Sequence, residues 1–220
     1  MKTIWTSALA LTLTVSAALA EHCRETTFEK TGFAVCEARA GEDLRLYLND
    51  PDGTPIGTFE RLSSTLAERG QTLVFAMNAG MYHPDRRPVG LYVEGGKEVS
   101  RLITSPGPGN FGLAPNGVFC IRESGFTVIE TRQFHDEHPV CQFATQSGPM
   151  LVIGGVLHPR FLADSDSRYI RNGVGVTAAG TRAYYAVSDA PLNFPPFARV
   201  LADAPHLHAT TCLDRNHLPL

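Results

Sequence analysis

The residues best able to do chemistry lie in two glycine-containing stretches of this chain. The longer stretch, residues 144–175, carries Gln146, Ser147 and Arg171, and the shorter one begins with Asn78 in N-A-G-M-Y. A forked guanidinium binds anionic oxygens, amide and hydroxyl groups bind sugar or phosphate oxygens, and glycine lets a backbone approach closely. The two stretches therefore predict a site for an oxygen-rich, anionic ligand.

Two of these residues also have an ordinary structural interpretation. Asn78 could serve a turn at the end of a strand. Arg171 lies among apolar residues, so it needs either an anionic ligand or a carboxylate of the protein itself. The acids nearest to the polar stretches are Asp164, Asp166 and Asp189. Glycosidic chemistry also requires carboxyl groups, so these acids are candidates for catalysis as well as for an ion pair.

Two other kinds of site have weaker support. A serine hydrolase would use Ser147 as its nucleophile, but the G-x-S-x-G elbow is absent, and Ser147 is expected to make a hydrogen bond instead. The chain has eight histidines, and none shows the H-E-x-x-H spacing or a similar one. We therefore predict no cofactor and leave open only a structural divalent cation.

Charge and the N-terminal residues restrict location and partners. The formal net charge is −3 without a basic patch, which argues against nucleic acid as a partner. Residues 1–20 are typical of a secretory signal, with Lys2, an apolar run from Ala8 and A-L-A before Glu21. That run is too short to span a bilayer, and no later segment is long and apolar enough. The sequence predicts a periplasmic or secreted protein without a membrane span, mature from Glu21.

The five cysteines of an exported chain favour disulfides over metal ligation. Cys23 and Cys36 flank a short predicted hairpin, and Cys120 and Cys141 each end an apolar run. These two pairings are hypotheses, because spacing does not determine connectivity. Cys212 is the odd cysteine.

The polar stretches lie at the ends of predicted strands. Strands are predicted at residues 34–40, 44–48, 72–77, 89–93, 98–103, 118–121, 126–130, 150–153, 156–157, 173–177 and 183–188. Helices are predicted at residues 59–68 and 195–201. Many strands and few helices indicate a strand-rich α/β or mixed α+β fold, which we expect to be a single domain with a mixed sheet and flanking helices.

Six motifs occur in a fixed order along the chain: N-A-G-M-Y, P-V-G-L-Y-V-E-G-G, F-G-L-A-P-N-G-V-F, A-T-Q-S-G-P-M-L-V, R-N-G-V-G-V and N-F-P-P-F-A. Together they resemble the phosphodiester glycosidase domain family, in its bacterial exported branch, over about residues 33–202. That family is typified by the uncovering enzyme, which removes N-acetylglucosamine from a sugar-1-phosphodiester. The resemblance implies an α/β fold with a substrate cleft at strand ends and loops.

The resemblance also implies roles for individual residues. Asn78 matches the asparagine of the family's N-G-G-F-F, and Arg171 matches the arginine of R-T-A-I-G. With Asp189 as the acid, these are the predicted catalytic residues. The predicted substrate-binding residues are Gly80, Tyr82, Asn116, Gln146, Ser147, Gly148, Asn172, Gly173 and Asn193.

The C-terminal end departs from the family pattern. The family continues with a segment like A-L-Y-L-D-G-x-I-S-S, whereas here Asp214 is followed by Arg215 and Asn216. We expect the domain, residues 21–220, to be truncated or frame-shifted after about residues 202–212. The loss of a strand and an acidic loop would impair both catalysis and stability.

The sequence thus predicts an exported glycosidase-type hydrolase acting on a sugar that is linked through its anomeric carbon to a phosphodiester. Arg171 would hold the phosphate, Asn78, Gln146 and Asn193 would bind sugar or phosphate oxygens, and a nearby acid would protonate the leaving group or activate water. The alternative is a non-catalytic envelope carbohydrate-binding protein that uses the same cleft.

Overall fold

The computed structural model describes residues 22–107, 109, 111–159, 168–203 and 207–213. The predicted signal, residues 1–20, and the acids Asp164 and Asp166 lie outside this range. Within it, no helix is long and apolar enough to cross a membrane.

Seven strands form an antiparallel sheet in the order β1-β2-β11-β10-β12-β8-β9. These strands are β1 (Cys23–Phe28), β2 (Thr31–Arg39), β8 (Met150–Ile153), β9 (Val156–Leu157), β10 (Asn172–Thr177), β11 (Arg182–Ser188) and β12 (Leu207–Cys212). The strand nearest the C-terminus of the described chain, β12, therefore lies inside the sheet, between β10 and β8.

Five strands form a second antiparallel sheet in the order β4-β3-β7-β5-β6. They are β3 (Tyr92–Glu94), β4 (Lys97–Ser100), β5 (Gly117–Arg122), β6 (Gly125–Glu130) and β7 (Phe143–Ser147). The chain passes from this sheet to the larger one at Gly148-Pro149, since Ser147 pairs with Gly117 and Met150 pairs with Thr211. The polar stretch singled out in the sequence is therefore the crossing between the two sheets.

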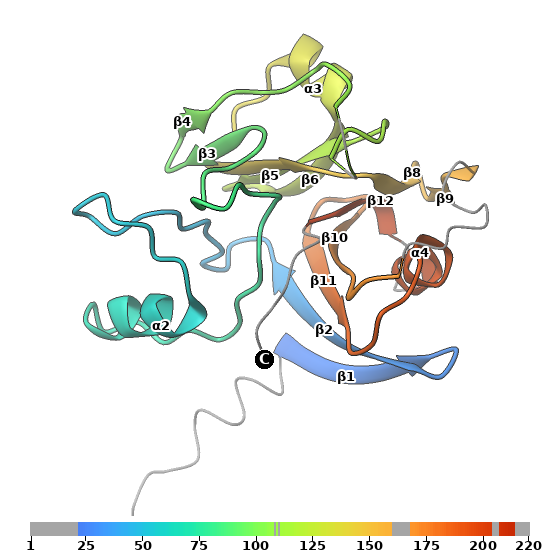
Figure 1. The fold of residues 1–220 in the computed structure, drawn as a ribbon, viewed down its shortest axis with the longest axis horizontal. Coiled ribbons are helices and arrows are strands. Elements are labelled where there is room, and N and C mark those ends of the chain that lie inside the picture. The colour runs from blue at the N-terminus through green and yellow to red at the C-terminus, as the bar shows by residue number, and fades with distance from the viewer. Residues whose placement is uncertain (1–21, 108, 110, 160–167, 204–206, 214–220) are drawn as a thin grey trace, which may run out of the picture.

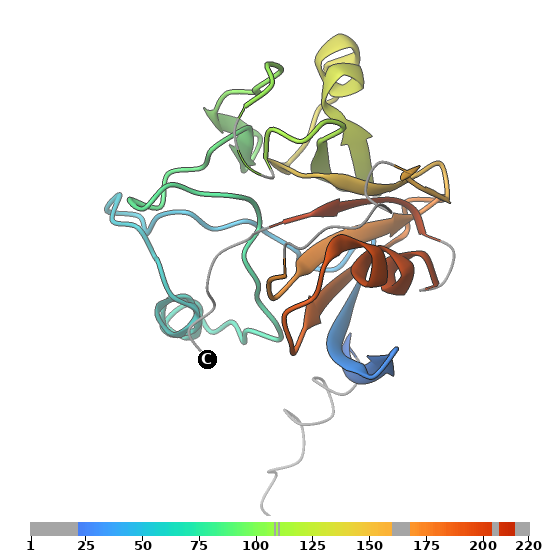
Figure 2. The ribbon, with the colours of Figure 1, turned by 45° about the vertical axis from the view of Figure 1, so that its right-hand side comes forward.

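Alternating side chains divide the molecule into layers. In β5, Phe119 and Ile121 face a core that both sheets share, while Val118 and Cys120 face a second core with Phe134 of α3 (Thr131–Glu137). On the other side, the seven-stranded sheet is covered by α4 (Phe194–Asp203). The order of layers is α4, larger sheet, smaller sheet and α3, as Figures 1 and 2 show. A strand covered on both faces reads as a continuous apolar run, which explains V-F-C-I.

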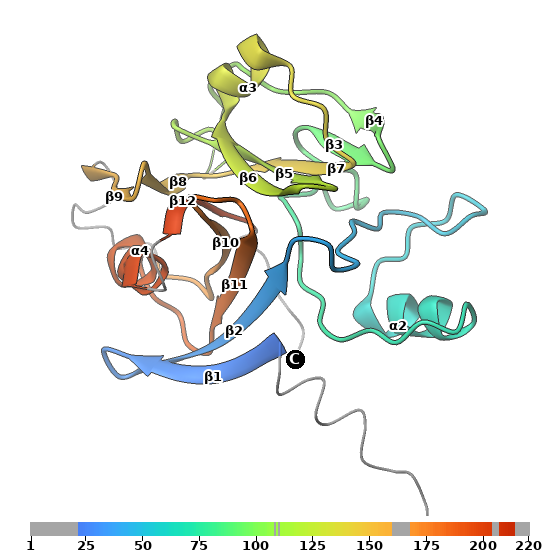
Figure 3. The same ribbon diagram turned by 180° about the vertical axis from the view of Figure 1, so that it is seen from behind.

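The helix α2 (Phe59–Ala67) stands apart from both sheets on an arm of the chain, which Figure 3 shows from behind. Thr58 caps it, because its hydroxyl accepts a hydrogen bond from the backbone N–H of Arg61 at 3.2 Å. Leu62 and Leu66 are its buried residues, and they pack with Ile56 in a small separate core. This arm forms one wall of the cavity described below.

The structure confirms the strand-rich mixed class, with its strands in two antiparallel sheets. It also confirms the two disulfides, Cys23–Cys36 and Cys120–Cys141, and leaves Cys212 as a buried free thiol. The helix predicted at residues 59–68 forms, and so do the hairpins β3-β4, β5-β6, β8-β9 and β10-β11.

The strands predicted at residues 44–48 and 72–77 are wrong. Both segments are apolar enough for a strand, but they line a cavity instead of pairing with a neighbouring strand. Strand formation depends on a partner backbone, which local composition does not specify. The sequence analysis missed β1, β7, α3 and β12.

Candidate functional site

The antiparallel register brings several predicted site residues together at one end of the inner strands β10, β11 and β12 of the seven-stranded sheet, which is called the edge below. Asn172, at the start of β10, pairs with Val187 near the end of β11, and Gly173 pairs with Cys212 at the end of β12. Because neighbouring antiparallel strands run in opposite directions, the start of one lies beside the end of the next. Residues 171–173, 187–189 and 212–213 are therefore neighbours despite their separation in sequence.

Arg171 is almost fully buried at this edge, with 3% of its surface exposed. Its Nε donates a hydrogen bond to the Leu192 carbonyl at 3.1 Å, and its guanidinium lies 3.8 Å from the ring centre of Phe194 and 5.4 Å from that of Tyr169. The Arg171 N–H donates to the Ser188 hydroxyl, and the Arg171 carbonyl accepts from the Ser188 N–H, both at 2.9 Å. Arg171 is thus a positive charge held rigidly among aromatic faces.

The charge of Arg171 also acts on Cys212, the last residue of β12. Burial raises the pKa of the Cys212 thiol to about 12, and the nearby positive charge of Arg171 acts in the opposite direction. The thiol is therefore neutral at physiological pH.

Ser147 is fully buried at the end of β7. Its hydroxyl donates to the carbonyl of Leu213, and its own carbonyl accepts from the Thr211 hydroxyl at 3.1 Å. Leu213 also donates its N–H to the Asn172 carbonyl at 3.2 Å. Leu213 thus connects the predicted residues of β7 with those of β10, and the hydroxyl of Ser147 is engaged in that connection.

The crossing between the sheets, Gly148-Pro149, is fastened to the same strand end. The Pro149 carbonyl accepts from the Cys212 N–H at 3.1 Å. On the α4 side, a Cβ at Gly173 would lie 2.9 Å from the Thr211 carbonyl and 3.1 Å from the ring of Phe197. The absence of a side chain at Gly173 thus allows α4 to pack closely.

Gln146 is 1% exposed, and its amide bonds to the protein on both sides. Its oxygen accepts from the backbone N–H groups of Leu91 at 3.1 Å and Ile103 at 3.0 Å. Its nitrogen donates to the Ile103 carbonyl at 2.7 Å and the Thr131 hydroxyl at 3.1 Å. These four bonds use the donor and acceptor capacity of the amide, so Gln146 holds the loops around β7 in place.

The segment that begins at Asn78 packs directly on β7. A Cβ at Gly80 would collide with the Thr145 hydroxyl and lie 3.1 Å from the Gln146 carbonyl, so only glycine fits this contact. The segment continues into a turn in which Met81 and Val89 are hydrogen-bonded at 2.9 Å. Asn78 is thereby fixed next to the end of β7.

Tyr82 and Asn116, two of the predicted binding residues, lie in loops around this region. Tyr82 forms an isolated bridge with Pro88, and the Arg86 guanidinium lies 4.9 Å from its ring centre. Asn116 directly precedes β5, and its amide nitrogen donates to the Phe111 carbonyl at 2.7 Å. Asn193 directly precedes α4, beside the Leu192 carbonyl that binds Arg171.

Asp189 follows β11 and is exposed. Its carboxylate accepts from the Gly32 N–H at 3.1 Å, and its own N–H donates to the Gly32 carbonyl at 3.0 Å. A Cβ at Gly32 would collide with this carboxylate. Ser188 lies opposite Arg171 and bonds to its backbone. Asp189 is the next residue along the chain.

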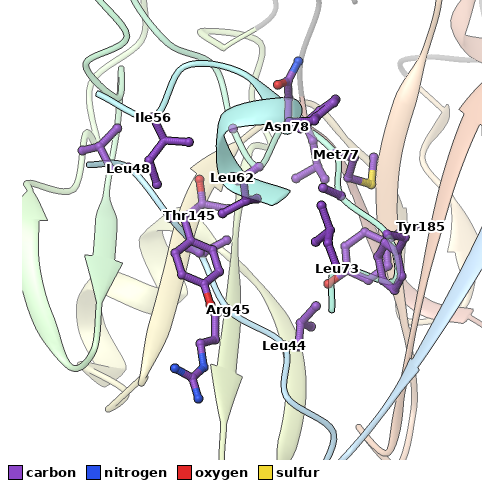
Figure 4. A pocket seen from close by; sticks show the side chains of 18 of the residues that line it. Leu44, Arg45, Leu48, Ile56, Leu62, Leu73, Met77, Asn78, Thr145 and Tyr185 are labelled. Atoms are coloured by element: carbon purple, nitrogen blue, oxygen red, sulfur yellow. The ribbon is translucent and has the colours of Figure 1, made fainter. Parts of the chain in front are cut away.

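A cavity of about 510 Å³ adjoins this site, between the α2 arm and the two sheets. Asn78, Gly80, Tyr82 and Leu213 belong to its wall. Figure 4 shows Asn78 at one edge of a group that includes Leu62, Leu73 and Met77. The cavity lining therefore includes polar motif residues as well as a large apolar surface.

Sequence reasoning missed two polar residues next to this cavity. Tyr92 and Glu94 alternate on β3, so their side chains lie on the same face of the strand. Burial raises the pKa of Glu94, although interactions with the Tyr92 hydroxyl and the Leu48 backbone act in the opposite direction. Tyr92 belongs to the cavity wall, whereas Glu94 is distinguished only by its burial and by its place two residues further along β3. Their spacing carries no motif.

Among the residues that the structure describes, no group of three or more His, Cys, Asp or Glu side chains is placed to hold a metal ion.

The sequence profile of the phosphodiester glycosidase family matches residues 71–214. The chain therefore belongs to the phosphodiester glycosidase family, as its motifs indicated. The matched range includes all the predicted site residues, from Asn78 to Asn193.

Protein YigE of Escherichia coli strain K12 is 36% identical over 157 residues, which are 71% of this chain and 61% of YigE. The chain thus spans about three fifths of the length of this curated relative. Two solved structures also match at low sequence identity. The catalytic domain of zebrafish N-acetylglucosamine-1-phosphodiester alpha-N-acetylglucosaminidase, auto-inhibited by its pro-peptide, has a TM-score of 0.49 at 14% identity, covering 88% of this chain and 69% of that one. A hypothetical protein from Synechocystis has a TM-score of 0.46 at 12% identity, covering 88% and 56%.

Proposed function

We propose that this protein hydrolyses the bond between the anomeric carbon of a sugar and the oxygen of a phosphodiester. The observation that carries the proposal is the buried guanidinium of Arg171 at the strand edge where the family motifs meet. A guanidinium offers parallel donors that match the oxygens of a phosphate, so an arginine at this strand end suits a ligand with negative charge. Family membership supplies the reaction class.

The chemistry of the leaving group explains why an arginine would matter most. When the carbon–oxygen bond breaks and water adds to the anomeric carbon, the diester leaves as a phosphate monoester. A phosphate monoester has a second pKa of about 6, so it departs as an anion and gains negative charge in the transition state. Arg171 would stabilise that charge with a preorganised, desolvated cation.

The remaining roles follow from position. Asn78 would bind the sugar or the phosphate from the segment that packs on β7, and Asn193 would do so from the start of α4. Gln146, Ser147 and Gly173 would act as positioning residues, because their contacts are made within the protein. A carboxylate would take the proton from water, with Asp189, which follows β11, as the first candidate and Glu94 on β3 as the second.

Hydrolysis of methyl N-acetylglucosamine-1-phosphodiester in ¹⁸O-labelled water tests the proposal. Cleavage at the anomeric carbon places the label in the sugar, whereas a phosphodiesterase would place it in the phosphate. Asp189→Asn and Glu94→Gln variants then identify the base by loss of kcat with little change in KM. Binding of the diester without release of sugar would instead support the carbohydrate-binding alternative.

We also propose export to the periplasm or the exterior, supported by the predicted leader and the two disulfides. Mass spectrometry of the protein from its native compartment should give an N-terminus at Glu21 and a single free thiol. Five free thiols would contradict export.

A further inference from the structure

The cavity beside the site has a predominantly apolar wall. Its aliphatic residues come from the 44–48 and 72–77 segments, from α2 and from the residues just before α2. Figure 4 shows Leu44, Leu48, Ile56, Leu62 and Leu73 among them. At about 510 Å³ it is within the usual size range of small-molecule pockets. Such walls stabilise water molecules poorly, because they offer few hydrogen-bond partners.

The charged residues of the wall do not favour a charged occupant. They are Glu42, Asp43, Arg45 and Arg86, two acids and two arginines whose charges cancel. Arg45 is already paired with Asp43. The charge balance therefore favours an occupant that is uncharged within the cavity.

The cavity and the candidate site share residues. Asn78 and Gly80 belong to both, and Leu213, which bonds to Ser147 and Asn172, belongs to the cavity wall as well. A ligand that fills the cavity would therefore reach the residues that surround the proposed reaction centre.

We infer that the cavity binds the alcohol part of the substrate and that this part is apolar, so that the substrate is a sugar phosphodiester of a long-chain alcohol. This inference rests on the proposed function. The sugar and the phosphate would lie toward Asn78 and Arg171, and the chain would fill the cavity.

The first test measures binding and does not depend on catalysis. N-phenyl-1-naphthylamine, an uncharged apolar fluorophore, should bind with one-to-one stoichiometry and be displaced by decyl phosphate but not by glycerol phosphate. Leu73→Trp, which fills the cavity, should weaken the binding of the fluorophore and of decyl phosphate about tenfold or more, because several methylene groups of each ligand are no longer buried. Val99→Trp, at a residue that is 50% exposed on β4, is the matched control and should change neither affinity.

Absence of binding by both probes to the wild type would overturn the inference.

The second test compares the methyl and decyl diesters of N-acetylglucosamine-1-phosphate as substrates, below the micelle concentration. The decyl diester should have a kcat/KM about tenfold or more above the methyl diester, and Leu73→Trp should abolish that preference while preserving methyl cleavage. Equal kcat/KM values would overturn the inference and leave the proposed function standing. Binding of decyl phosphate with cleavage of neither diester would overturn the proposed function, and with it the assignment of the cavity to the alcohol part.

Discussion

At the scale of single residues, the buried polar side chains of the candidate site fall into two groups. Arg171 presents a charge held by Leu192 and two aromatic rings, which suits it to an anionic ligand. The Gln146 amide and the Ser147 hydroxyl form hydrogen bonds that join neighbouring segments of the chain, which suits them to fixing the loops. Substitutions at the two kinds of residue should therefore affect different measurements.

Replacing Arg171 with lysine should weaken binding of a sugar-1-phosphodiester about ten- to a hundredfold, because lysine keeps the charge but loses the planar, two-pronged donor. Binding of the neutral sugar should change little. Isothermal titration with both ligands measures this, and Arg199→Lys, whose arginine pairs with Glu29 at the surface, is the control. Equal affinity of wild type and variant for the diester would remove Arg171 from the site.

Replacing Gln146 with leucine should lower the free energy of unfolding by several kcal/mol, because two backbone N–H groups, one carbonyl and one hydroxyl lose their partner. Urea denaturation measures the change. Gln133→Leu, at an exposed position of α3, should change the stability by less than about 0.5 kcal/mol. A loss below about 1 kcal/mol at position 146 would show that the network adds little to stability.

At the scale of elements, the two disulfides have different structural roles. Cys23–Cys36 joins β1, at the edge of the described sheet, to its neighbour β2. Cys120–Cys141 joins the centre of β5 to the segment between α3 and β7, within a buried core. The second disulfide therefore fixes the start of β7, the strand that leads to the crossing at Gly148-Pro149.

Replacing both Cys120 and Cys141 with alanine should lower the free energy of unfolding by about 3 kcal/mol, the size expected for opening a loop of this length. Replacing Cys23 and Cys36 should cost less in global unfolding, because β1 can detach alone while the rest of the sheet persists. Urea denaturation compares the two pairs, and hydrogen exchange locates any fraying. A larger global loss for the edge pair would contradict this assignment of roles.

At the scale of the whole molecule, the core that both sheets share contains an ionisable group. Burial raises the pKa of Tyr185, and its ring packs on Phe75 and Phe119 in this core. The native phenol therefore keeps its proton at a pH where the unfolded one, with a pKa of about 10, has lost it. Because the native state then binds more protons, stability must fall as the pH rises above about 10.

Tyr185→Phe should make the stability fall less steeply above pH 10, by as much as about 1.4 kcal/mol per pH unit. Urea denaturation between pH 8 and pH 11 measures the slopes. Identical slopes of unfolding free energy against pH in wild type and variant would contradict this expectation. They would show that the Tyr185 phenol loses its proton through local opening of the shared core, before global unfolding.

The sequence by itself determined the family, the residue types of the site, the two cysteine pairings as hypotheses, and the hairpins whose turns carry paired glycines. These features are local, or they are motifs whose order alone identifies the family. Only the tertiary structure decided that H-A-T-T-C becomes the inner strand β12, that residues 72–77 line a cavity instead of pairing, and that Gln146 faces inward. Each of these outcomes depends on which distant backbone or side chain becomes a neighbour, and that is set by long-range packing and hydrogen bonding.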